Sequence, residues 1–115
     1  MLTLYGLKDC DTCRKARKQL ENAGISVDFV DVRESPLSAE KRRDFAASLG
    51  DALINKRSTT WRELSESDRS GNIESLIERF PTVMKRPVIL SDKGISLGWD
   101  KAAMALHLGT SGSAS

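Results

Sequence analysis

The chain contains 115 residues, of which 30% are charged, and its formal net charge at neutral pH is only +2. This length suits a single domain with a substantial hydrophobic core, and the small net charge gives no reason to expect direct nucleic-acid binding. The sequence has no apolar run long enough to cross a bilayer and no signal-peptide pattern at its start. We therefore expect a cytoplasmic protein that does not associate with membranes.

The first part of the chain predicts a strand, a helix and a second strand. Residues 2–5 form a short apolar run with a β-branched threonine, which ends at Gly6. Apolar residues then recur at steps of three and four, as on one face of a helix; they are Cys13, Ala16, Leu20 and Ala23. Gly24 suits the left-handed position that ends such a helix, and residues 27–32 predict the second strand. This pattern is a βαβ unit, whose two strands we expect to be parallel.

The middle of the chain predicts a helical insertion over about residues 38–80. Ser38 is placed to cap a helix that Gly50 ends, and residues 51–55 resemble a short helical turn. Residues 60–63 have capping-box spacing and predict another short helix through residue 64, whereas residues 65–72 are polar and predict turns. Apolar residues at i, i+3, i+4 and i+7 predict a helix over residues 73–80, which Pro81 ends.

The last part of the chain predicts a β-hairpin followed by a helix. Residues 87–90 and 95–97 are typical of strands, and residues 92–94 form a tight turn between them. Asp100 is placed to cap a helix that we expect to end near His107, and the Gly/Ser-rich residues 108–115 predict a flexible tail. The complete pattern predicts an α/β fold in which a four-stranded mixed sheet carries an inserted helical subdomain, as one domain over residues 1–107.

Cys10 lies where the first strand gives way to the helix. The first helical turn has unpaired N–H groups and the positive end of the helix dipole, and both stabilise a thiolate. Arg14 and Lys15 add positive charge nearby, so we expect the pKa of Cys10 to be lowered and its thiolate to be a nucleophile. Cys13 follows at a spacing that permits a disulfide, which makes it a candidate resolving or switch thiol. The CxxC pair beside a strand–helix unit fits a redox role better than a structural disulfide.

Two other interpretations of the cysteines have to be weighed. A CxxC pair can be half of a zinc site, but the chain has no third cysteine and one histidine, so we expect no bound metal. Cys13 falls on the apolar face of the predicted helix and is therefore also a candidate for a small core residue. Cys10 does not fall on that face, so the core interpretation suits it poorly.

Several residues elsewhere are candidates for a binding role. Arg86 precedes Pro87 at the start of the third strand; if the bond between them is cis, the arginine would face the cysteine loop, and otherwise it is a solvated residue at an edge. Arg57 lies among hydroxyl side chains in a polar loop, where it is a candidate oxyanion or carboxylate binder or a plain surface residue. We expect His107 to be exposed at a helix end, and Trp61 and Trp99 to be packing residues.

Residues 5–16, 55–64 and 85–89 together resemble the ArsC/Spx family of arsenate reductase-like proteins, with the YffB-like proteins as the nearest branch. The resemblance extends over residues 1–107 with the segments in order. It implies a thioredoxin/glutaredoxin-like fold with a helical insertion. It also favours a cis bond between Arg86 and Pro87 and a place for Arg86 in the active site.

The resemblance also implies an activity. In the glutaredoxin-coupled arsenate reductases, the counterpart of Cys10 attacks arsenate, glutathione resolves the adduct and three arginines hold the oxyanion. Arg86 matches the arginine before the proline, but this chain has Asn55 and Trp99 where the other two arginines are expected, with Arg57 displaced by two positions. A site with fewer arginines should hold a multiply charged oxyanion poorly, which disfavours arsenate reduction.

We therefore expect a glutathione-dependent thiol-disulfide reductase in which Cys10 is the nucleophile. Arg86 assists catalysis, and the residues expected to bind glutathione or the substrate are Lys8, Arg57, Arg86 and Pro87. No cofactor is expected to be bound, since glutathione acts as a co-substrate and glutaredoxin as a candidate partner. The CxxC pair also resembles that of the Spx regulators, which implies the alternative of a redox-switched protein that binds RNA polymerase.

Overall fold

A computed structural model describes residues 2–109 and divides the chain into two compact units. The sheet unit combines residues 2–31 with residues 86–109, and the helical unit comprises Val32–Lys85. The helical unit contains the insertion predicted over about residues 38–80 and extends beyond it at both ends. The assignment of residues 1–107 to one domain stays a prediction, and residues 110–115 of the predicted tail lie outside the described residues.

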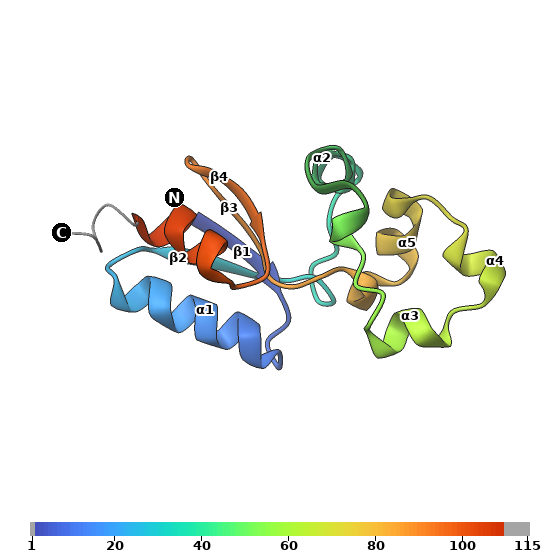
Figure 1. Cartoon of the computed structure of the whole chain (residues 1–115), viewed down its shortest axis with the longest axis horizontal. Coiled ribbons are helices and arrows are strands. Elements are labelled where there is room, and N and C mark those ends of the chain that lie inside the picture. The colour runs from blue at the N-terminus through green and yellow to red at the C-terminus, as the bar shows by residue number, and fades with distance from the viewer. Residues whose placement is uncertain (1, 110–115) are drawn as a thin grey trace. The chain divides into compact units, whose positions relative to one another are not determined.

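The sheet unit is built on four strands in the order β2-β1-β3-β4 (Figure 1). Strand β1 (Leu2–Gly6) pairs in parallel with β2 (Val27–Asp31) and antiparallel with β3 (Val88–Ser91). Strand β4 (Gly94–Leu97) forms an antiparallel hairpin with β3. The predicted four-stranded mixed sheet, with its parallel first pair and its hairpin, is confirmed.

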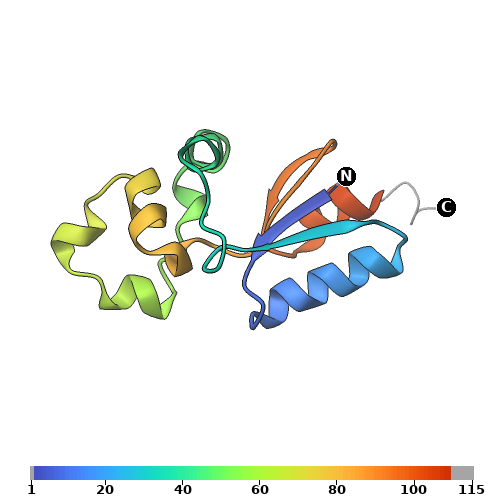
Figure 2. The ribbon, with the colours of Figure 1, turned by 180° about the vertical axis from the view of Figure 1, so that it is seen from behind.

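Helix α1 (Asp11–Asn22) lies alongside β1 and β2, as both views of the ribbon show (Figures 1 and 2). It buries the predicted apolar face, on which Cys13, Ala16 and Leu20 are fully shielded from solvent. These three side chains form one core cluster with the side chains of the sheet that face them, Leu2, Leu4 and Ile89. Because burying a large apolar side chain contributes about 1.5–3 kcal/mol, this cluster fixes the start of α1 next to the end of β1.

The C-terminal segment returns to the same cluster. Asp100 caps helix α6 (Lys101–Met104), because its Oδ1 accepts a hydrogen bond of 2.9 Å from the N–H of Ala103. The chain then continues as a wider, π-helical segment, η3 (Ala105–Gly109), and Leu108 packs against the cluster. The helix thus continues two residues beyond its predicted end at His107.

The helical unit consists of short helices around a core of its own. Its elements are α2 (Ala39–Leu49), η1 (Gly50–Leu53), α3 (Thr59–Glu63), α4 (Glu66–Arg69), α5 (Ile73–Arg79) and η2 (Pro81–Val83). Buried apolar side chains fill its interior, among them Phe45, Leu53, Leu76, Ile77, Val83 and Met84. Across residues 2–109, none of the helices combines the length and the apolar character that a membrane span requires.

The structure corrects two details of the predicted insertion. Helix α3 is capped by Ser58, whose Oγ accepts from the N–H of Trp61 at 3.1 Å, and not by Thr60. Thr60 is already inside the helix, where its hydroxyl bonds to that of Thr82. The segment predicted as turns contains α4, because Ser65 caps it through a 3.0 Å hydrogen bond from the N–H of Asp68. In both places a serine with a helical turn after it outweighed the polar composition.

Candidate functional site

Cys10 occupies the N-cap position of α1, with extended backbone angles of φ −85° and ψ 118°. A backbone turn holds it there, since its N–H donates to the carbonyl of Leu7 at 3.1 Å. The neighbouring N–H of Lys8 donates to Oδ2 of Asp31 at 2.9 Å, which ties the cysteine loop to the end of β2. The side chain of Cys10 is half-buried, so an incoming sulfur or oxyanion can reach it while most of its surroundings are fixed.

The surroundings of Cys10 favour its thiolate. Burial raises the pKa of the Cys10 thiol, but hydrogen bonds from the backbone N–H and the thiol of Cys13 and from Arg86, with the positive charge of Arg86, outweigh burial and lower it. The N–H of Cys13 belongs to the first turn of α1, where no carbonyl of the helix accepts from it. The expected lowering of the pKa is therefore present, and the helix start contributes to it.

The cation that acts on Cys10 differs from the one expected. We predicted Arg14 and Lys15, but the groups that lower the pKa of Cys10 include Arg86 and neither of these two. The guanidinium of Arg14 forms an ion pair with Asp11, and the side chain of Lys15 is exposed to water. A paired or fully hydrated cation has little effect on a neighbouring thiolate, because solvent screens its charge.

Cys13 is fully buried in the core cluster, as its place on the apolar face of the helix predicted. Burial, together with the neighbouring Cys10, raises the pKa of the Cys13 thiol to about 12, although a hydrogen bond with the backbone of Leu7 opposes this. Close packing holds it in place: a Cβ atom added at Gly6 would lie 2.3 Å from the Sγ of Cys13. Cys13 is thus a core residue and a hydrogen-bond donor to Cys10 at once, and its participation in redox chemistry stays a prediction.

Arg86 and Pro87 come to the cysteines from the start of β3. The bond between them is cis, as the resemblance implied, and Pro87 is fully buried. The carbonyl of Pro87 accepts a 2.8 Å hydrogen bond from the N–H of Gly98, so it belongs to the hairpin and does not face the cysteine loop. Arg86 lowers the pKa of both Cys10 and Cys13 through its charge, which places its guanidinium beside the pair.

The other two predicted binding residues, Lys8 and Arg57, lie in different units of the chain. Lys8 is anchored through its backbone beside Cys10 and has an exposed side chain. Arg57 belongs to the helical unit, where its N–H donates to the Oδ1 of Asn55 at 3.0 Å. A role for Arg57 in binding glutathione or a substrate therefore stays a prediction.

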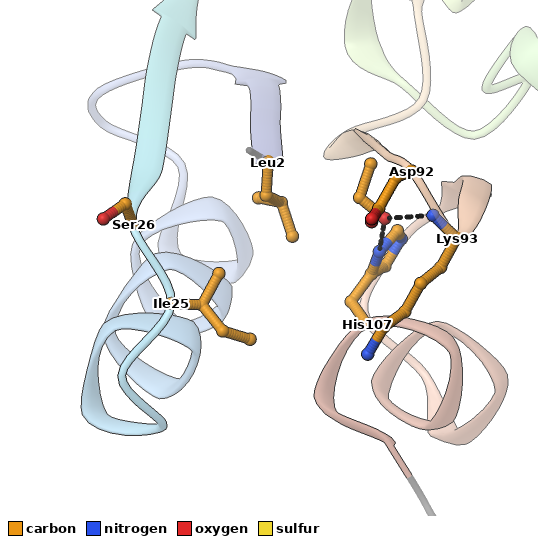
Figure 3. Close-up of a pocket in the computed structure, with 7 residues that line it drawn as sticks. Leu2, Ile25, Ser26, Asp92, Lys93 and His107 are labelled. Atoms are coloured by element: carbon orange, nitrogen blue, oxygen red, sulfur yellow. Dashed lines mark hydrogen bonds between the residues drawn. The ribbon is translucent and has the colours of Figure 1, made fainter.

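The prediction of an exposed His107 is wrong. His107 is only 2% exposed, and its two ring nitrogens are hydrogen-bonded to the hydroxyls of Ser91 (3.0 Å) and Ser96 (2.8 Å), on the two strands of the hairpin. Figure 3 shows it on the wall of a cavity of about 490 Å³, opposite Leu2 and Ile25, at the end of β1 that lies away from Cys10. The sequence could not reveal the two serines as partners, because they are far from His107 along the chain.

Three residues that support the site were not predicted as site residues. Gly6 leaves room for the Sγ of Cys13, and Asp31, which is 6% exposed, anchors the loop through the N–H of Lys8. Gln19 accepts a 2.8 Å hydrogen bond from the indole of Trp99, which packs against the same core cluster as Cys10. The role of Asp31 could have been predicted from a carboxylate at the end of a parallel strand. The roles of Gly6 and Gln19 depend on tertiary packing and could not. The prediction that Trp99 is a packing residue is confirmed.

Comparison with known proteins agrees with this geometry. The model of the ArsC family matches residues 5–105. A protein of uncharacterised function from Haemophilus influenzae is 38% identical over 107 residues, which cover 88% of this chain and 93% of the relative. The global transcriptional regulator Spx 1 of Oceanobacillus iheyensis is 29% identical over 107 residues, with 88% and 82% covered.

A solved structure described as a YffB protein superposes with a TM-score of 0.84 at 30% identity, over 95% of this chain and all of that one. This agreement and the strand order establish the thioredoxin-like fold that the resemblance implied. The chain therefore belongs to the ArsC family of thiol-redox proteins.

Proposed function

We propose that this protein is a glutathione-dependent thiol-disulfide reductase with Cys10 as its nucleophile. The observation that carries the proposal is a half-buried cysteine at a helix N-cap whose pKa is lowered by Cys13 and Arg86. A thiolate attacks far faster than a thiol, so these contacts increase the reactive fraction of Cys10 at neutral pH. The alternative of a purely structural Cys10 gives no reason for a lowered pKa.

The chemistry follows from these contacts. The Cys10 thiolate attacks one sulfur of a disulfide, forms a mixed disulfide with it and releases the other half as a thiolate. Glutathione then attacks the substrate's sulfur in the mixed disulfide, which returns Cys10 as a thiolate and leaves a disulfide of glutathione and the substrate. A second glutathione attacks the glutathione sulfur of this disulfide, which releases the substrate thiol and forms oxidised glutathione. Arg86 stabilises Cys10 as the leaving group in the second step, because its guanidinium favours the anionic sulfur.

The buried second cysteine supports an external thiol for the second step. Cys13 has a pKa of about 12, so almost none of it is the attacking thiolate at neutral pH. It also has no path to solvent, since its side chain is fully buried. Glutathione, or a glutaredoxin that delivers it, is the expected resolving agent.

The test is turnover of a small neutral disulfide with glutathione, coupled to glutathione reductase so that NADPH consumption reports the rate. We expect measurable turnover in the wild type, none in Cys10→Ser and most of the wild-type turnover in Cys13→Ser. Absence of glutathione-dependent turnover in a folded wild-type protein, or unchanged turnover in Cys10→Ser, contradicts the proposal. Arsenate added as substrate should give little reduction, because only Arg86 among the described arginines acts on the cysteines.

The second candidate is a redox-switched regulator that binds RNA polymerase. It is favoured by the paired Cys10 and Cys13, both of which are free thiols, and by the similarity to a global transcriptional regulator. A pull-down of purified bacterial RNA polymerase by the immobilised protein, with and without oxidation, tests it. Binding that depends on the redox state and is lost in Cys10→Ser supports this candidate, and equal or no binding in both states rejects it.

A further inference from the structure

A second feature beside Cys10 is a groove between α1 and the edge strand β2. It encloses about 490 Å³, within the range of about 300–1,000 Å³ that small-molecule sites occupy. Its lining consists of Lys8, Arg14, Arg17, Val27, Asp28 and Phe29, all in the sheet unit. Cys10 is not part of this lining, but Lys8 lies two residues before it in the chain and Arg14 lies one helical turn after it.

Two of its cations are held in place by neighbouring side chains. The guanidinium of Arg17 lies 5.3 Å from the ring centroid of Phe29, and its Nε donates to Oε2 of Glu21 at 3.3 Å. Arg14 is paired with Asp11 through one terminal nitrogen. Within residues 2–109, the remaining N–H groups of these two guanidiniums make no hydrogen bonds. Stacking and pairing therefore orient both guanidiniums but leave donors for a ligand.

Cationic side chains outnumber carboxylates in the lining. It carries three cationic side chains and one carboxylate, Asp28, whereas Asp11 and Glu21 pair with the arginines from outside the lining. Val27 and Phe29 are partly buried against the core cluster and give the groove an apolar wall. Guanidiniums bind carboxylates through parallel N–H···O bonds, so such a groove suits a small molecule with carboxylates and an apolar or peptide backbone.

We propose that this groove binds the carboxylates of a small acidic peptide disulfide while its sulfur reacts at Cys10. This inference rests on the proposed function and assigns it a substrate class. The Cys10 thiolate displaces one half of the peptide disulfide as a thiolate and remains joined to the other half as a mixed disulfide. Arg14 and Arg17 hold the bound half by its carboxylates.

The test compares the rate of a single exchange step, so it does not depend on turnover. Reduced protein is mixed with oxidised glutathione, which is anionic, and separately with dithiodipyridine, which is neutral, and modification of Cys10 is followed by mass spectrometry. Arg17→Glu is compared with Lys18→Glu, which makes the same change of charge at the next position but outside the groove lining. Arg17→Gln serves as a milder variant if charge reversal disturbs the fold.

We expect Arg17→Glu to slow the reaction with oxidised glutathione about fivefold to tenfold, and to leave the rate with dithiodipyridine unchanged. Lys18→Glu should change either rate less than twofold. Equal slowing by Arg17→Glu and Lys18→Glu, or equal slowing of both reagents, would overturn the proposal. If the charge selectivity appears but no glutathione-dependent turnover occurs, the proposed function is wrong and the groove assignment is supported. If turnover occurs without charge selectivity, the proposed function is supported and the groove assignment is wrong.

Discussion

The two cysteines of the CxxC pair have opposite chemical roles, although they are three residues apart. Cys10 is half-buried and has a lowered pKa, whereas Cys13 is fully buried and has a pKa raised to about 12. The same contact accounts for part of both shifts, because the Cys13 thiol donates its proton toward Cys10. Cys13 therefore stabilises the Cys10 thiolate by remaining protonated.

This contact predicts how Cys10 responds to changes at Cys13. A hydrogen bond to a charged group contributes about 1.5–3 kcal/mol, and the weak S–H donor is expected near the lower limit, which corresponds to about tenfold in rate. Cys13→Ala should raise the pKa of Cys10 and slow its alkylation near neutral pH about tenfold. Cys13→Ser keeps a donor and should preserve most of the wild-type rate. Iodoacetamide alkylation of Cys10 across a pH series, read by mass spectrometry, gives both values.

A packing effect would give a different pattern. If Cys13 acted only as a core residue, the alanine and serine variants would alkylate with the same pH profile, whatever their stability. Urea unfolding of both variants separates the two effects, because loss of a buried sulfur destabilises the fold without moving the pKa of Cys10. Identical pH profiles for wild type and Cys13→Ala would contradict the donor role.

Among the helices and strands, hydrophobic periodicity predicted most of the elements. The remaining features depend on capping or on contacts between residues far apart in the chain. The apolar residues at steps of three and four located α1, and the same spacing located α5, because each buries one face against neighbouring elements. No comparable periodicity marks α4, whose four residues are stabilised by the Ser65 cap. At the site, the N-cap place of Cys10 is a local property and was predictable. Because 76 positions separate Arg86 from Cys10 in the chain, the residues alone left a place for Arg86 near the cysteine loop open, and the family resemblance favoured it.

The hairpin and the C-terminal helical segment are joined by a histidine that resists protonation. Burial and the positive charge of Lys93 lower the pKa of His107 below its ordinary value of 6.5, and a hydrogen bond with the backbone of Ile89 only partly opposes this. In the unfolded chain the imidazole takes up a proton more readily than in the folded state. Its contribution to stability is therefore present above pH 6.5 and is lost as the pH falls through the lower folded-state pKa.

We therefore expect the free energy of unfolding to decrease as the solution is acidified below pH 6.5. His107→Gln keeps a hydrogen-bonding side chain for Ser91 and Ser96 but cannot be protonated in this range. It should be less stable than the wild type at neutral pH, and its stability should change less on acidification. Urea unfolding at a series of pH values measures this, and parallel curves for the two proteins would show that His107 is not the titrating group.

At the level of the whole molecule, the groups with the largest effects on the pKa of Cys10 are Cys13 and Arg86, and both lie in the sheet unit. Arg86 and Arg57 were both predicted to bind glutathione or the substrate, but they fall on opposite sides of the division between the units. The sequence already made this distinction, because the insertion predicted over about residues 38–80 contains Arg57, whereas Arg86 lies outside it, two residues before β3. Measurement of thiol reactivity and of glutathione dependence can separate their contributions.

The matched variants Arg86→Met and Arg57→Met remove one charge each and keep a long side chain. Arg86→Met should raise the pKa of Cys10 and slow its alkylation near neutral pH about tenfold, because it removes a charge-assisted hydrogen bond to the thiolate. Arg57→Met should leave the pH profile of alkylation unchanged, since the groups with the largest effects on this pKa lie in the sheet unit. If Arg57 binds glutathione, its variant will instead raise the KM for glutathione at an unchanged alkylation rate. A shifted pH profile in Arg57→Met would mean that the helical unit acts on the Cys10 thiolate directly.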